Sequence, residues 1–187
     1  RGVNVVARDE EQISFDATQY LIQLGHTRIA FLGGSPKYSY TFDRLNGYRR
    51  AIDEQGLEYH EEYVLGGFDE QHAARFLINC PEVTATVIIN ELFASRVLPI
   101  LQNSGRVIPD SLSVVTYDDT ELSRNFAPPL TSVSFPFFQE GFWSVRVLME
   151  QVRQPAILNV QVVLQANLVK RESCRSLNPV LQEAHSA

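Results

Sequence analysis

Short apolar runs alternate with helical patterns along the sequence, and this alternation restricts the fold more than any other feature. Strand-like runs rich in β-branched and aromatic residues are expected at 28–32, 63–66, 84–89 and 112–116. Amphipathic helices are expected before and between them, at 13–24, 43–55, 69–77 and 91–104. Units of about 25–35 residues fit strand–helix–strand crossovers. We therefore predict an α/β fold, an open parallel sheet with helices on both faces.

The pattern changes after Pro128 and Pro129. A short strand at 131–134 precedes an amphipathic helix near 137–152 and an extended stretch at about 158–169. From Arg175 the chain is polar, and we expect a frayed tail. Because the sequence starts inside a strand-like run, without an initiator Met or a signal peptide, we expect it to be part of a longer protein.

The composition is that of a globular protein and argues against several kinds of partner. Of 187 residues, 44% are hydrophobic and 20% are charged. A net charge of −6 without a clustered basic face makes the chain a poor nucleic-acid binder by itself. No apolar run approaches the ~20 residues of a membrane helix, so no membrane partner is expected. Cys80 and Cys174 suit neither a disulfide framework nor a zinc site, and we expect no metal and no cofactor.

Polar side chains follow the expected parallel strands, where ligands bind in open α/β sheets. Arg44, Phe68, Asn90 and Asp118 should face one crevice there. A guanidinium that only donates, a carboxylate that only accepts and an amide that does both suit a polyhydroxylated ligand, although a nucleoside or an amino acid would fit too. Structural alternatives stay open at this point. Arg44 and Asp118 would form an ion pair, Asn90 would cap a helix, and Phe68 would belong to the core.

Sequence motifs of common enzymes are missing. There is no GxSxG nucleophile elbow, and the Gly-rich turn after the first strand matches neither the P-loop nor GxGxxG. The four histidines show no metal-binding spacing, and His26, between a helix-ending glycine and a strand, is expected to be a hydrogen-bonding connector. We therefore expect no catalytic residues.

Six sequence strings, in order along the chain, together resemble the lactose/galactose-repressor (LacI/GalR) family of bacterial transcription regulators. They are LIQLGHTRIA at 21–30, LGG at 32–34, RLNGY at 44–48, IPDSLSVVTYDD at 108–119, PPLT at 128–131 and LVKRES at 168–173. The family is similar to periplasmic sugar-binding proteins, in which two α/β subdomains flank an effector cleft. A helix-turn-helix headpiece reads operator DNA. The resemblance implies a cytoplasmic bacterial protein.

By this resemblance, residues 1–134 and 163–174 form the C-terminal effector-binding subdomain of a periplasmic-binding-protein-like type I fold. Residues 135–162 form an excursion that belongs to an otherwise missing N-terminal subdomain, and 175–187 form the tail. The headpiece is absent from this sequence, so any contact with operator DNA would be made by a missing N-terminal part.

The resemblance also assigns roles to single residues. Arg44, Asn90 and Asp118 match the family's effector-binding Arg, Asn and Asp, while Phe68 and Phe137 match lining positions. The strand-end argument reaches the first three independently. Departures from the family pattern at Glu91, Thr116 and 8–10 leave the identity of the effector open.

In a repressor of this kind, the C-terminal subdomain would also hold a two-fold interface. We expect it on the helix at 91–104 and the segment 122–126, where Phe93, Leu122 and Phe126 would need cover; the alternative is that they are ordinary core residues. No leucine heptads occur in the tail, so a homodimer is expected rather than a coiled-coil tetramer.

The favoured hypothesis is the effector-sensing and dimerisation region of a DNA-binding repressor, which responds to a small sugar or a related metabolite. The alternative is a periplasmic sugar-binding protein of the same fold, and a small α/β enzyme is a third hypothesis. The residues upstream of Arg1 would discriminate the first two, because one requires a helix-turn-helix and the other a secretion signal.

Overall fold

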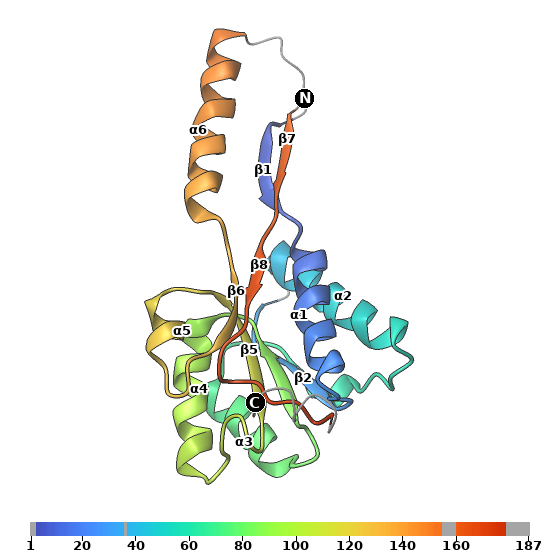
Figure 1. The fold of residues 1–187 in the computed structure, drawn as a ribbon. Coiled ribbons are helices and arrows are strands. Elements are labelled where there is room, and N and C mark those ends of the chain that lie inside the picture. Colours follow the sequence, from blue (N-terminus) through green and yellow to red (C-terminus); the bar gives the residue numbers. More distant parts are fainter. Residues whose placement is uncertain (1–2, 36, 155–159, 179–187) are drawn as a thin grey trace.

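A six-stranded sheet organises the larger part of the molecule, with the strands in the order β3–β2–β4–β5–β6–β8 (Figure 1). The computed structural model describes residues 3–35, 37–154 and 160–178. The strands of this sheet are β2 (Ile29–Leu32), β3 (Val64–Leu65), β4 (Ala85–Ile88), β5 (Ser113–Asp118), β6 (Thr131–Ser134) and β8 (Asn167–Val169). All neighbours are parallel except β8, which runs antiparallel to β6. The predicted parallel sheet is confirmed, with one antiparallel strand added at its edge.

Helices cover both faces of this sheet, as predicted. On one face, α1 (Glu10–Gln23) packs against α2 (Ser39–Glu54), and on the other α3 (Glu70–Asn79) packs against α4 (Glu91–Asn103) (Figure 1). The short α5 (Glu121–Asn125) lies beside α4, and a 3₁₀ turn, Glu61–Tyr63, precedes β3. Because helices cover β2 and β4 from both sides, every residue of these strands is buried, which explains their nearly continuous apolar sequences.

Side-chain caps and one glycine set the positions of these helices. Asp9, Asp69 and Asn90 each accept a hydrogen bond from a backbone amide in the first turn of the helix that follows. At Gly47, a Cβ atom would lie 2.0 Å from the carbonyl oxygen of Glu11, so only glycine allows α1 and α2 to approach so closely. This contact brings the start of α1 beside the middle of α2, which positions the site described below.

An arm extends from one end of the sheet (Figure 1). It consists of α6 (Phe137–Arg153) packed on two parallel strands, β1 (Val5–Arg8) and β7 (Gln161–Leu164). Residues 5–8 and 163–164, predicted to belong to the larger part, therefore lie in the arm. The reason is that β1 pairs with a strand more than 150 residues away in the sequence, which local patterns do not reveal.

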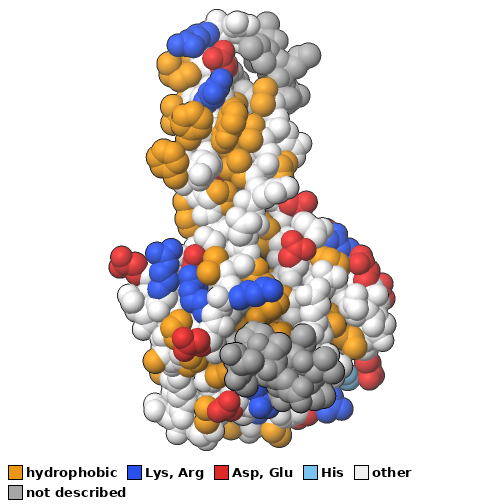
Figure 2. All heavy atoms as spheres, viewed as in Figure 1, with side chains coloured by type: hydrophobic (Ala, Val, Ile, Leu, Met, Phe, Trp, Pro, Cys, Tyr) orange, Lys and Arg blue, Asp and Glu red, His pale blue; other side chains and the backbone are white. Residues whose placement is uncertain are grey.

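The arm presents apolar side chains to solvent. None of the residues of α6 is buried, and Phe138 is 81% exposed. Several apolar side chains gather on the face of the arm that Figure 2 shows. No helix in the described ranges is long and apolar enough to span a membrane.

His26 joins three segments, which confirms its predicted role as a connector. Its Nε2 lies 3.1 Å from the carbonyl oxygen of Arg175, so it donates there, and Nδ1 accepts from the hydroxyl of Thr84 at 2.9 Å. The backbone amide of Leu177 also donates to the carbonyl oxygen of Leu24, at 2.6 Å. Residues 175–177, predicted as the start of a frayed tail, are thus held against the end of α1, while 179–187 lie outside the described residues.

Lowering the pH should destabilise the protein through His26. Burial lowers the pKa of His26 from 6.5 to about 4, so between these values the unfolded chain binds a proton that the folded chain does not. The stabilisation is complete above pH 6.5, and we expect about 3 kcal/mol of the free energy of unfolding to be lost as the pH falls to about 4. Urea unfolding at several pH values measures it. His26→Gln should flatten this dependence and His72→Gln, at an exposed position, should not; an unchanged slope in His26→Gln would contradict the assignment.

Candidate functional site

The carboxyl ends of β2, β4 and β5 lie at the edge of the sheet from which the arm extends (Figure 1). Gly33 and Gly34 follow β2 with φ of 92° and 90°, a backbone conformation that favours glycine. A Cβ atom at Gly33 would lie 2.5 Å from Cγ2 of Ile89, directly after β4. The segments that follow β2 and β4 therefore approach each other closely.

Arg44 is buried at this edge. Only 4% of its surface is exposed. Its Nε donates to Oε2 of Glu10 at 2.8 Å, and Nη1 donates to the carbonyl of Ile89 at 2.7 Å. The guanidinium lies 4.1 Å from the centre of the Tyr117 ring. A structural ion pair is thus present, with Glu10 and not Asp118 as the partner.

Sequence reasoning missed two charged residues that complete this edge, Arg8 and Glu10. The second carboxylate oxygen of Glu10 lies 3.2 Å from Nε of Arg8, the last residue of β1. Arg8 lies 4.1 Å above the Phe135 ring and 3.9 Å from Glu140 of α6. A chain of ion pairs therefore runs from the arm to Arg44. The one available signal was the departure from the family pattern at 8–10.

Asp118 ends β5 with a half-buried side chain that has no hydrogen bond to any described residue. Its φ of 94° is unusual for a residue with a side chain, and such strain is often found at functional sites. Burial raises the pKa of Asp118, Arg44 opposes this shift, and Glu91 adds to it. Asp118 thus shares the electrostatic environment of Arg44 and has acceptor capacity left for a ligand.

Asn90 has the capping role that was its structural alternative. Its Oδ1 accepts from the amide of Phe93 at 2.7 Å, so it caps α4. Its amide nitrogen makes no hydrogen bond within the part of the chain that the structure describes, and so retains two donors. Asn90 directly follows Ile89, whose carbonyl binds Arg44, and Asp118 ends β5, which pairs in parallel with β4, so the three predicted polar residues lie at the same edge of the sheet.

The neighbouring Glu91 has a structural role. Its buried carboxylate accepts from the amide of Thr120 at 3.1 Å, from the Thr120 hydroxyl and from the Ser123 hydroxyl at 2.5 Å. It thereby fastens the start of α4 to the turn between β5 and α5, which follows Asp118. Asp119, also buried, pairs with Arg171 at 2.5 Å.

Replacing Glu91 with glutamine should loosen this turn. Glutamine has one acceptor oxygen where the carboxylate has two, so at least one buried donor loses its partner. We expect the free energy of unfolding to fall by about 1–3 kcal/mol. Thermal unfolding measures the change, with Glu121→Gln as the control at an exposed position in α5. Equal unfolding temperatures for the two variants would show that Glu91 does not hold the turn.

The predicted aromatic residues have different surroundings. Phe68 is 42% exposed and Phe137 is 52% exposed, so both have free ring surface near the edge. Phe93, predicted for a dimer interface, is only 4% exposed and packs edge-on against Phe68, so it belongs to the core. Leu122 is partly exposed, and Phe126 packs against the core from a half-buried position.

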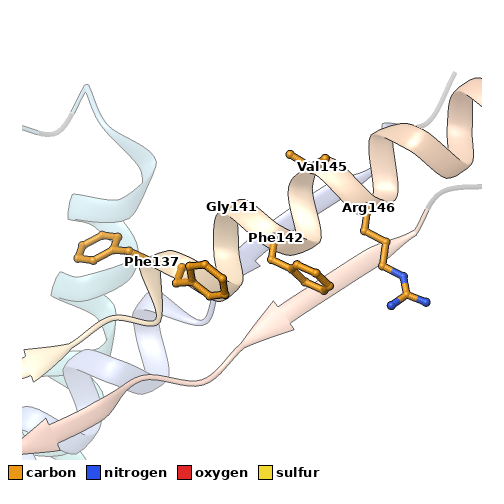
Figure 3. A pocket seen from close by; sticks show the side chains of 6 residues that line it. Phe137, Gly141, Phe142, Val145 and Arg146 are labelled. Atoms are coloured by element: carbon orange, nitrogen blue, oxygen red, sulfur yellow. The ribbon is translucent and has the colours of Figure 1, made fainter.

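A hollow of about 670 Å³ lies along α6, begins at Phe137 and is almost entirely apolar (Figure 3). All the residues that line it belong to α6: Phe137, Phe138, Gly141, Phe142, Val145 and Arg146. It lacks the carboxylates and amides that lie at the carboxyl ends of β2, β4 and β5, which we call the strand-end edge. We therefore do not assign the hollow to the polar ligand. Among the described residues, no group of three or more His, Cys, Asp or Glu side chains has the arrangement of a metal site.

Comparison with known proteins identifies the family. Residues 18–174 match the periplasmic binding protein-like domain. The chain belongs to this family. Two curated relatives of this periplasmic binding protein-like chain are regulators: the HTH-type transcriptional regulator CelR of Thermobifida fusca, 35% identical over 179 residues, and the repressor PurR of Vibrio campbellii, 33% identical over 175. The matches cover 88% and 91% of this chain but 53% and 52% of the relatives, so the chain spans about half of their length.

Solved structures agree with this assignment. A complex of the regulator CelR with cellobiose has a TM-score of 0.85 and 35% identity, covering 91% of this chain and 54% of that one. A putative LacI regulator from Bacillus cereus subsp. cytotoxis has a TM-score of 0.86 and 26% identity, covering 94% and 64%. The resemblance to the LacI/GalR family, predicted from sequence strings, is confirmed.

Proposed function

We propose that this chain is the effector-binding region of a bacterial DNA-binding repressor that senses a small carbohydrate. The meeting of Arg44, Asn90 and Asp118 at the strand-end edge carries the proposal. Together these groups offer donors and acceptors for vicinal hydroxyls, and the exposed ring of Phe68 offers an apolar face for the C–H surface of a sugar. The cellobiose complex of the relative CelR supports the same class of ligand.

The position of this edge gives the ligand a means of control. The chain passes between the larger part and the arm at 8–10, 134–137 and 164–167, and the first two crossings carry Arg8, Glu10 and Phe135. A ligand held at the edge contacts both the larger part and the arm. It therefore favours the arm orientation for which its affinity is higher, by the difference in binding free energy between the two orientations. Coupling of about 1–3 kcal/mol corresponds to a change in operator affinity of roughly 5- to 150-fold.

The remaining parts of the proposal concern the longer protein. A helix-turn-helix outside these 187 residues would bind operator DNA in the cytoplasm. Two copies would associate as a homodimer, and of the residues predicted for that interface, Leu122 and Phe126 stay as candidates. The regulator names of the relatives support this function over a periplasmic solute-binding protein.

Calorimetry of the longer protein with a panel of sugars, cellobiose first, tests the proposal. We expect one member to bind saturably and to change the affinity for operator DNA in the same preparation. Saturable binding without any effect on DNA would favour the solute-binding protein. Catalytic turnover of a sugar or sugar phosphate that is lost in Asp118→Asn would favour an enzyme.

A further inference from the structure

We propose that Glu10 is a specificity-determining residue, which makes the strand-end edge accept uncharged polyhydroxylated ligands and reject anionic ones. The inference rests on the proposed function, because it concerns the ligand of the same site. It is carried by the position of the Glu10 carboxylate between two arginines, Arg8 and Arg44.

The charges of both arginines are countered within the protein. One oxygen of Glu10 lies 2.8 Å from Nε of Arg44 and the other lies 3.2 Å from Nε of Arg8. The Glu10 side chain is 10% exposed and that of Arg44 is 5% exposed, so solvent screens this pair only weakly. An anionic ligand would have to compete with a fixed carboxylate for the arginine that the sequence assigned to ligand binding.

The surrounding charges also oppose an anion. The cations that act on Asp118 are Arg44 and Arg8, while Glu10 and Glu91 act on it in the opposite sense. Glu140 adds another carboxylate 3.9 Å from Arg8. A phosphate or carboxylate group would therefore meet an excess of negative charge, whereas a hydroxyl donates to Asp118 without any charge penalty.

The aromatic neighbours hold this arrangement in place. Arg44 lies over Tyr117 and Arg8 lies over Phe135, each 4.1 Å from the ring centre. The two guanidinium groups therefore have restricted freedom to leave Glu10 and turn toward an anion. Without the Glu10 charge, Arg44 loses its carboxylate partner and Arg8 keeps only Glu140, at 3.9 Å, so the two guanidinium groups can act as preorganised cations toward an oxyanion.

The test compares Glu10→Gln with Glu11→Gln in the 187-residue chain, with inorganic phosphate as the probe at constant ionic strength. Glu11 is the matched control, because it is the next residue of α1 and also pairs with an arginine, Arg50, at 2.5 Å. We expect Glu10→Gln to bind phosphate at least about tenfold more tightly than the control and the native chain, measured by calorimetry. Equal phosphate affinity in the two variants would overturn the proposal, whether or not any sugar binds.

A second comparison needs no variant and therefore does not depend on the folding of Glu10→Gln. The native chain is titrated with cellobiose and with cellobiose 6-phosphate. We expect the uncharged sugar to bind more tightly by about tenfold or more, and tighter binding of the phosphorylated sugar would contradict the role of Glu10. A gain of phosphate binding in Glu10→Gln supports the role of Glu10 even where cellobiose does not bind, and the failure then concerns the proposed carbohydrate ligand.

Discussion

Replacing Arg44 with alanine should lower the free energy of unfolding by about 3–5 kcal/mol, because it breaks a buried ion pair and leaves a carboxylate behind. Glu10 then keeps only Arg8 as a cationic partner, at 3.2 Å, and the carbonyl of Ile89 loses the donor that now lies 2.7 Å away. Native domains are stable by about 5–15 kcal/mol, so this loss is a large fraction of the total. Urea unfolding at pH 7 measures it.

A second arginine of the same helix provides the control. Arg49 is exposed and donates to the hydroxyl of Tyr59 at 3.1 Å, so Arg49→Ala should change the free energy of unfolding by about 0.5 kcal/mol or less. Arg44→Ala should also lose effector binding, measured by calorimetry at temperatures where the variant is folded. Equal urea midpoints for the two variants would contradict the structural role of Arg44. Unchanged effector affinity in Arg44→Ala would contradict its role in binding.

The fold was predictable because its strongest signals are local. Strands β2 and β4 are covered on both faces, so they appear in the sequence as short apolar runs, and the helices between them show one apolar face. The rule that ligands bind at the carboxyl ends of parallel strands then selects Arg44, Asn90 and Asp118 without knowledge of the packing. The arm's strand pairing could not be predicted, because Val5 and Gln161 come together only in the folded chain.

The partners of the site residues were beyond the sequence for a similar reason. Glu10 and Arg44 belong to different helices, and nothing in either helix shows that Gly47 lets them approach. The interface prediction at Phe93 was wrong about exposure because consecutive apolar residues in a first helical turn do not reveal which one faces the core. In α4 it is Phe93 that turns inward and Leu92, 56% exposed, that turns outward.

Replacing Asp118 with asparagine should weaken effector binding by about 10- to 150-fold, which corresponds to about 1.5–3 kcal/mol for a hydrogen bond to a charged group. The fold should not be weakened. Burial raises the pKa of Asp118, so above its folded-state pKa the ionised carboxylate opposes folding, and the neutral amide removes this cost. Asparagine also tolerates positive φ better than most residues. Calorimetry with the sugar that binds best in the panel measures the affinity.

The adjacent carboxylate should give the opposite result. Asp119 is 7% exposed and pairs with Arg171 at 2.5 Å, so Asp119→Asn should lower the free energy of unfolding by about 1–3 kcal/mol. Its direct effect on ligand affinity should be small, because its carboxylate is already engaged by an arginine. The two variants thus separate binding from stability at neighbouring positions. If Asp118→Asn were destabilised as much as Asp119→Asn and bound the sugar normally, Asp118 would be a structural residue, and the strand-end edge would lose the carboxylate that we assign to the ligand.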